Sequence, residues 1–230
     1  MPVPAPQEVK ICALIPAYNE AGTIASVVAG ARQYTAMVAV VDDGSTDGTA
    51  EAAEAAGAVC LRHRRNEGKG AAVRTGMQYL LERDFSHVLF LDGDGQHNPE
   101  DIPLLIQSAR STGAGIVIGA RSFDRARMPV ERYYSNRMGS RVASWLAGQE
   151  VLDSQSGFRL IRVDQLRRLH LKARRYEIEM EILIKMSRAG CRIEHVPVQT
   201  IYHDGGPTKM KPVRDTLRIC LCSLAFRWGK

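Results

Sequence analysis

Residues 88–97 read Val-Leu-Phe-Leu-Asp-Gly-Asp-Gly-Gln-His, an apolar run that ends in two carboxylates separated by one glycine. The apolar part predicts a buried β-strand. Such a strand would deliver Asp92 and Asp94 to its carboxyl end, where Gly93 and Gly95 let the backbone turn sharply. Open α/β sheets bind ligands at strand ends of this kind. The stretch therefore indicates both a fold class and a place for ligand binding.

The side chains of this turn suit a hard metal ion. Asp92, Asp94 and the amide of Gln96 form an all-oxygen set, which fits Mg²⁺ or Mn²⁺ holding a diphosphate better than it fits zinc. An ordinary surface turn rich in Asp and Gly can have the same sequence. Asp-x-Asp is a short motif, so it indicates a metal site only in the right structural context. The remainder of the chain has to separate these two interpretations.

Further apolar, β-branched runs alternate with stretches of helical composition. This alternation predicts an α/β fold with a mostly parallel central sheet, helices on both faces, and strand carboxyl ends that open on a common crevice. Polar segments follow the strands, as a ligand site at that crevice requires. The other runs are residues 11–15, 37–41, 58–61 and 116–118, and the polar segments are 16–20, 42–45, 66–70 and 92–94.

Length, charge and cysteine content limit the classes of protein to which the chain can belong. The 230 residues, 45% of them hydrophobic, suffice for one α/β domain with a buried core. The net charge of +6 favours anionic partners. The five cysteines lack zinc-binding spacing, so we interpret them as reduced. Residues 1–8 show no signal-peptide pattern, and the longest apolar run, 219–226, is far below the about 18 residues that span a bilayer. We expect a cytoplasmic protein.

Two of the polar segments leave alternatives open. Asp42 and Asp43 can accept hydrogen bonds from a uracil or guanine ring, or they can serve as turn and helix caps with the Ser-Thr-Asp that follows. Lys69, ahead of a helix expected over residues 71–82, is a candidate phosphate or sugar contact. The chain has neither a P-loop nor Gly-x-Gly-x-x-Gly after its first strand, which argues against a dinucleotide-binding dehydrogenase.

Four motifs, in order along nearly the whole chain, resemble those of the inverting family 2 glycosyltransferases of GT-A fold, most closely the polyprenyl- or dolichyl-phosphate sugar synthases. Residues 16–20, 42–49, 92–94 and 153–159 match that family's first nucleotide loop, base-binding loop, Asp-x-Asp metal motif and Asp-x-x-Ser-Gly-Phe-Arg motif. The resemblance implies one GT-A catalytic domain over residues 1–230. Its nucleotide-sugar-binding half would cover about 9–121, and its acceptor-binding half about 122–230, ending in an amphipathic helix.

The resemblance also implies roles for particular residues. Asp42 or Asp43 would read the base of a UDP- or GDP-sugar, and Mg²⁺ or Mn²⁺ on Asp92, Asp94 and Gln96 would bridge the diphosphate. Asp94, Arg121 and Asp153 would be the catalytic group, with Arg121 steadying phosphate. Asp153 would be the base for a hydroxyl acceptor, or would position the acceptor or pair with Arg159 if the acceptor is a phosphate. The remaining substrate contacts would be Pro16, Tyr18, Glu20, Lys69, Gly93, Arg159, Lys209 and Lys211, and His203 is a further candidate metal ligand.

We therefore expect a metal-dependent inverting transfer of a hexose or N-acetylhexosamine from a UDP- or GDP-sugar to a polyprenyl phosphate. One rival is the same transfer to a soluble saccharide, lipid or protein hydroxyl. Another is a non-catalytic basic binding module. We expect no nucleic-acid partner, because the clustered carboxylates would repel phosphates unless a cation intervened.

The end of the chain bears on the membrane. Val213, Leu217, Leu221, Leu224 and Trp228 recur at helical spacing, so this helix either lies on a membrane or packs on the domain. Many bacterial synthases of the type resembled carry transmembrane helices that this chain lacks. We expect a peripheral enzyme at the cytosolic membrane face, with or without a separate membrane partner.

Overall fold

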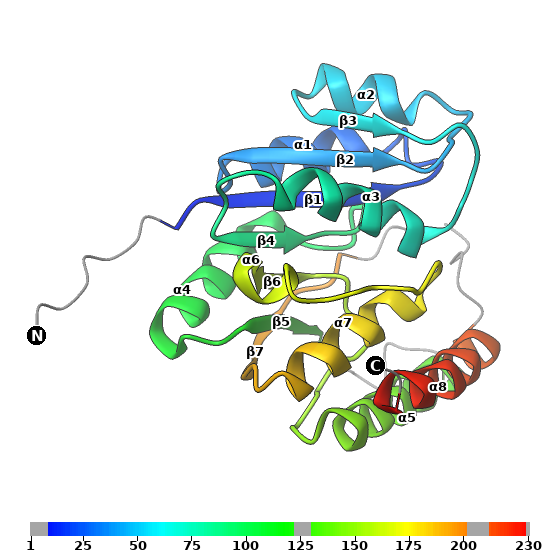
Figure 1. Ribbon diagram of the computed structural model, residues 1–230. Helices are drawn as coiled ribbons and strands as arrows, with labels where there is room; N and C mark the ends of the chain where they lie inside the picture. Colours follow the sequence, from blue (N-terminus) through cyan, green and yellow to red (C-terminus); the bar gives the residue numbers. More distant parts are fainter. Residues whose placement is uncertain (1–8, 122–129, 202–211, 229–230) are drawn as a thin grey trace, which may run out of the picture.

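A seven-stranded mixed sheet forms the centre of the computed structural model, which describes residues 9–121, 130–201 and 212–228 (Figure 1). The strand order is β3-β2-β1-β4-β6-β5-β7. Strand β6 runs antiparallel to both of its neighbours, and the other paired strands of the sheet are parallel. The strands are β1 (Ile11–Ala17), β2 (Met37–Asp42), β3 (Val59–Arg62), β4 (His87–Phe90), β5 (Ile116–Arg121), β6 (Arg159–Arg162) and β7 (Ile193–Val198).

Helices cover both faces of this sheet (Figure 1). Helices α3 and α7 pack on one face, and α1 and α4 pack on the other. Helices α5 and α8 pack against each other and against α7, as an outer pair. The helices are α1 (Ile24–Arg32), α2 (Thr49–Ala55), α3 (Lys69–Leu81), α4 (Ile102–Thr112), α5 (Val130–Ala147), α6 (Val163–Leu166), α7 (Glu177–Arg188) and α8 (Pro212–Trp228), with a 3₁₀ turn η1 (Pro99–Asp101).

The central strands send their side chains alternately into two buried layers. Along β1, Cys12 and Leu14 join the cluster on the α3 and α7 side, whereas Ile11, Ala13 and Ile15 join the cluster on the α1 and α4 side. A parallel strand that is buried on both faces has a nearly continuous apolar sequence. This is why the central strands are visible in the sequence.

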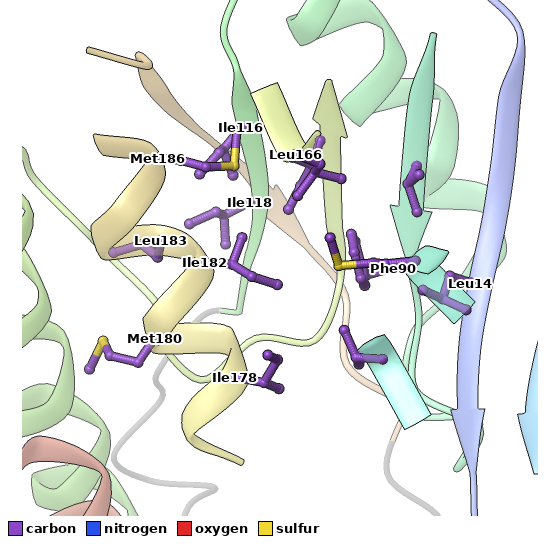
Figure 2. Close-up of a cluster of buried hydrophobic side chains, with 14 of the residues drawn as sticks. Leu14, Phe90, Ile116, Ile118, Leu166, Ile178, Met180, Ile182, Leu183 and Met186 are labelled. Atoms are coloured by element: carbon purple, nitrogen blue, oxygen red, sulfur yellow. The ribbon is translucent and has the colours of Figure 1, made fainter. Parts of the chain in front are cut away.

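Helix α7 buries one apolar stripe against the sheet. Figure 2 shows Met186 and Ile182 of α7 near Ile116 and Ile118 of β5, and all of these residues, with Ile178, belong to one buried cluster. The spacing of four residues places Ile178, Ile182 and Met186 on one side of the helix. The packing orients the first turn of α7, with its glutamates, toward the carboxyl ends of the parallel strands (Figure 1).

The five predicted apolar runs are strands, so the expected α/β fold with a mostly parallel sheet is confirmed. The expected helix over residues 71–82 is also present, as α3. Strand β6 and helix α5 are among the elements that were not predicted. Strand β6 is only Arg-Leu-Ile-Arg, too short and too charged at its ends to stand out, and α5 exposes apolar side chains that blur its periodicity.

In the part of the chain that the structure describes, none of the helices has the length and apolar character needed to cross a bilayer.

Candidate active site

The first two polar loops form one hydrogen-bonded unit at the carboxyl ends of β1 and β2. The amide of Asn19 donates to Ser45 Oγ at 2.9 Å, and the amide of Glu20 donates to Thr49 Oγ1 at 2.8 Å. In return, Asn19 Oδ1 accepts from the amide of Thr46 at 3.0 Å. The structure thus brings together residues 16–20 and 42–49, as predicted. Tyr18 stands at this unit with 38% of its surface exposed.

Asp42 and Asp43 are both buried but have different partners. Asp42 Oδ1 accepts from the amide of Ser45 at 3.1 Å, within its own loop. Asp43 accepts from the amides of Glu67 at 2.9 Å and Gly68 at 2.8 Å, and Asp43 Oδ1 lies 2.7 Å from Nδ1 of His63. Asp43 therefore holds the turn before α3 in place. Only Asp42 has its hydrogen bonds confined to the loop expected to face a base.

Lys69 links the Asp-x-Asp turn to α7. Its Nζ donates to Asp92 Oδ1 at 2.6 Å and also contacts the carboxylate of Glu179. Burial alone would lower the pKa of Lys69, but the two carboxylates raise it above its ordinary value. For Asp92, burial would raise the pKa, and Lys69 and then His97 lower it. Glu179 was missed by sequence reasoning, because a glutamate in the first turn of a helix is commonplace.

Asp92 and Asp94 lie close together, but neighbouring groups offset their negative charges to different extents. Asp94 Oδ1 accepts from the amide of Gln96 at 3.0 Å, and burial together with the charge of Asp92 raises the pKa of Asp94. A Cβ at Gly157 would lie 2.3 Å from Asp92 Oδ2, so the 153–157 segment presses directly on this carboxylate. The second carboxylate therefore has unmet negative charge, which a divalent cation would neutralise.

The donor set fits a metal ion that also binds substrate oxygens. Among the described residues, no group of three or more His, Cys, Asp or Glu side chains is arranged to hold a metal. Two carboxylates with the ion completed by phosphate oxygens and water is the usual arrangement for Mg²⁺ in nucleotide sites. Asp92 and Asp94 fit that description, whereas a closed zinc site would need four protein ligands.

His97 is a second residue that sequence reasoning missed. It is 7% exposed, its ring lies 5.2 Å from that of Phe158, and its Nε2 has no hydrogen-bond partner among the described residues. That nitrogen lies 3.5 Å from Asp92 Oδ2, too far for a good hydrogen bond but aimed at the carboxylate. Beside it, the amide of Ile201 donates to the carbonyl of Gln96 at 2.9 Å.

Arg121 and Asp153 form a buried, two-pronged ion pair. Arg121 Nε lies 2.7 Å from Asp153 Oδ2, and Nη2 lies 3.0 Å from Oδ1. Asp153 is fully buried; burial alone would raise its pKa, but Arg121 lowers it. Among the described residues, Asp153 is paired with Arg121, whereas the guanidinium of Arg159 donates to main-chain carbonyls. The end of β5 and the 153–159 motif meet in space, and the sequence separation of 32 residues hides that contact.

Arg159 supports the site through the main chain. Its Nε, Nη1 and Nη2 donate to the carbonyls of Ser156, Glu179 and Ser154 at 2.8, 2.8 and 2.7 Å. Burial lowers the pKa of this guanidinium. Arg159 thus fastens the 153–157 segment to the start of α7, behind the Asp92 carboxylate.

The other predicted residues lie as follows. Pro16 lines a small cavity of about 20 Å³, together with Lys69, Asp92 and Arg159, that has room for one water. The carbonyl of Gly93 accepts from the hydroxyl of Thr23 at 2.7 Å, which ties the Asp92–Asp94 turn, here called the metal turn after its expected ligand, to the start of α1. His203, Lys209 and Lys211 lie outside the described residues.

Comparison with protein families gives a match to the model described as Glycosyl transferase family 2, over residues 12–169. Among relatives, the chain is 30% identical over 235 residues to undecaprenyl-phosphate mannosyltransferase of Micrococcus luteus, covering 95% of this chain and 96% of the relative. It is 30% identical over 240 residues to UDP-N-acetylglucosamine–dolichyl-phosphate N-acetylglucosaminyltransferase of Methanococcus voltae, covering 94% and 96%.

Solved structures agree with this match. Glucosyl-3-phosphoglycerate synthase from Mycobacterium tuberculosis, in complex with Mg²⁺ and uridine diphosphate, superposes with a TM-score of 0.72 at 25% identity, covering 96% of this chain and 79% of that one. The same enzyme with Mn²⁺, uridine diphosphate and phosphoglyceric acid gives a TM-score of 0.75 at 24% identity, with 96% and 78% covered. The fold and the family model together show that the chain is a glycosyltransferase of GT-A fold that belongs to glycosyl transferase family 2.

Proposed function

We propose that this glycosyltransferase moves a sugar from a UDP- or GDP-sugar to a polyprenyl phosphate, with Mg²⁺ or Mn²⁺ at the Asp92–Asp94 turn. The observation that carries the proposal is this turn itself, where Asp92 pairs with Lys69 while the neighbouring Asp94 keeps a raised pKa beside the charge of Asp92. Relatives named for transfer to undecaprenyl or dolichyl phosphate cover nearly the whole chain, which supports the acceptor class.

The donor would lie across the ends of β1, β2 and β4. Asp42 would accept hydrogen bonds from the base, with Tyr18 at the edge of the same loop. Asp92 and Asp94, with the side chain of Gln96, would hold the metal. The metal would neutralise the diphosphate as it leaves. Glu20, Gly93 and the predicted residues His203, Lys209 and Lys211 remain donor-side proposals.

The ion pair of Arg121 and Asp153 favours a phosphate acceptor. A base must be able to take a proton, yet Asp153 is fully buried, is bound to Arg121 through both oxygens, and has a lowered pKa. A phosphate oxygen is already anionic and can attack the anomeric carbon without a base. Arg121, at the end of β5, would present its positive charge to that phosphate.

The outer helices offer a surface for a lipid acceptor. Helix α5 exposes Val130, Tyr134, Met138 and Trp145, spaced at multiples of about one helical turn. Helix α8 exposes Leu217, Leu221 and Leu224 in the same manner. Large exposed apolar rows of this kind are typical of helices that lie on membranes. We propose that α5 and α8 hold the enzyme peripherally at the membrane surface.

A nucleotide-release assay tests this function. UDP- and GDP-sugars are screened with Mg²⁺ or Mn²⁺, with and without a short polyprenyl phosphate. The proposal expects release that depends on the lipid phosphate and yields a glycolipid. Donor binding without lipid-dependent release would favour the hydroxyl acceptor, and the absence of any nucleotide-sugar binding would contradict both.

A further inference from the structure

Four exposed arginines surround the turn that precedes Lys69. Arg64 and Arg65 lie between β3 and α3, and Arg174 and Arg175 lie just before α7. None of the four guanidinium groups makes an ion pair or hydrogen bond within residues 9–121, 130–201 and 212–228. In the same chain, exposed Arg62 is paired: it contacts Glu51 and Glu54 at 2.7 Å.

The two arginine-bearing loops touch through their backbones. A Cβ on Gly68 would lie 2.5 Å from the carbonyl oxygen of Arg174 and 3.3 Å from Cγ of Arg175. The amide of Ala71 donates to the same Arg174 carbonyl at 3.2 Å. The positive φ of 98° at Gly68 suits a residue without a side chain, which allows this close approach.

Two buried carboxylates fix these loops. Asp43 holds the first loop through the amides of Glu67 and Gly68. Glu181, fully buried, holds the second through the amides of Lys172 at 2.9 Å and Ala173 at 2.8 Å. The backbone is thus pinned in place while the arginine side chains extend into solvent. Like charges held together without counter-charges disfavour the folded state, so an external anion is the natural partner.

The loop that carries Arg174 and Arg175 continues directly into α7, which packs against α8. Glu177, two residues further on, pairs with Arg218 of α8, with 3.0 Å between Oε1 and Nε. One residue before Arg218 in the sequence, Leu217 belongs to the exposed apolar row of α8. In Figure 1 this loop, the start of α3 and the start of α8 lie at the same side of the molecule. The basic and apolar surfaces are therefore neighbours.

We propose that Arg64, Arg65, Arg174 and Arg175, here called the arginine rim, bind the anionic headgroups of a membrane while α5 and α8 lie on its apolar boundary. The headgroup phosphates match the rim in charge, and arginine is suited to phosphate recognition. Docked in this way, the mouth of the site at Lys69 and Asp92 faces the lipid. The inference rests on the proposed lipid acceptor and extends it to the orientation of the enzyme.

Vesicle sedimentation tests the rim without any sugar transfer. The full chain is mixed with phosphatidylcholine vesicles that contain or lack phosphatidylglycerol. The variants are Arg64→Gln/Arg65→Gln and Arg174→Gln/Arg175→Gln. The control, Arg110→Gln/Arg168→Gln, removes the same charge from exposed arginines in the last turn of α4 and just after α6. Each rim variant should lose about tenfold or more in binding to anionic vesicles, and the control should not. At about 1 M salt the difference should vanish.

A second measurement tests whether the arginine rim binds the nucleotide of the donor instead of lipid headgroups. Binding of UDP or GDP with Mn²⁺, without vesicles, should be unchanged in both rim variants. Rim variants that bind anionic vesicles as well as the control does would overturn the inference, as would weaker nucleotide binding with normal vesicle binding. Failure of the proposed acceptor would appear separately, as wild-type protein that binds vesicles but forms no glycolipid.

Discussion

Lys69 shares its charge between a proposed metal ligand and a carboxylate that no motif predicts. A cation arriving at Asp92 must coexist with the ammonium group 2.6 Å from Oδ1. Glu179, on the far side of Lys69, supplies the second negative charge that makes this possible. The pocket therefore places two carboxylates, Asp92 and Glu179, on one lysine, and we expect the charge of each to affect the affinity for metal.

Substitution Glu179→Gln should weaken Mn²⁺ binding in the presence of UDP or GDP by about tenfold, or ~1.4 kcal/mol. The physical reason is that Lys69 then rests on Asp92 alone and the pocket loses a negative charge. Mn²⁺ electron paramagnetic resonance measures the affinity directly. The control Glu177→Gln, also at the start of α7 but paired with Arg218, should leave it unchanged. Equal Mn²⁺ affinity in both variants would contradict the prediction that the charge of Glu179 supports metal binding beside Lys69.

Asp153→Asn should lower the free energy of unfolding by about 3 kcal/mol, because it leaves the guanidinium of Arg121 buried without its counter-charge. Urea denaturation measures the change. A variant with unchanged stability but no turnover would instead support Asp153 as the catalytic base, and with it a hydroxyl acceptor.

Part of the site could be predicted and part could not, for identifiable reasons. Asp42, Asp92 and Asp94 follow apolar strands, and the carboxyl ends of parallel strands meet at one edge, so the sequence places them together. Glu179 and His97 reach Lys69 and Asp92 from a helix start and a loop, where their residue types are unremarkable. Glu179 reaches the site because of the way α7 packs, and His97 reaches it because of the path of the chain after β4.

Among the elements, the segment before β6 controls the metal turn by contact. Gly157→Ala should reduce Mn²⁺ affinity and turnover by about tenfold or more, because the new Cβ would lie 2.3 Å from Asp92 Oδ2 and must displace it. The matched control is Gly22→Ala, where a Cβ meets nothing within 4 Å. Thermal unfolding should be nearly the same for both proteins. Normal metal binding in the Gly157 variant would show that Asp92 tolerates displacement.

Strand β4 carries a half-buried histidine, His87, at its start. Burial lowers the pKa of His87 from 6.5 to about 4. Between these two pH values, His87 therefore binds a proton in the unfolded chain but not in the folded chain. The free energy of unfolding should therefore fall by about 2 kcal/mol as the pH drops from 6.5 to 4, after allowance for partial exposure. In His87→Gln this component should be absent. Parallel pH curves for the two proteins, measured by urea denaturation, would contradict the assignment.

Strand β6 shows the limit of pattern reading for elements. Four residues with arginine at both ends give no clear period, and the strand exists because β4 and β5 each offer it an antiparallel edge. Inserted between them, β6 carries the 153–157 segment to the metal turn. The α/β class could thus be predicted from the parallel strands, while the one antiparallel strand, which shapes the site, depends on its neighbours.

At the scale of the whole molecule, a proposed nucleotide-binding edge is combined with an ion pair proposed to favour a phosphate acceptor and a surface proposed to lie on a membrane. Asp94 tests this combination best, because among the described residues it forms no ion pair, and burial and the charge of Asp92 raise its pKa. Glycolipid formation from a nucleotide sugar and a short polyprenyl phosphate with Mn²⁺ is measured for wild type and Asp94→Asn. We predict lipid-dependent product for wild type and a loss of at least about a hundredfold for the variant, with unfolding unchanged. Glycolipid formation by Asp94→Asn at near the wild-type rate would contradict metal-assisted transfer at this turn.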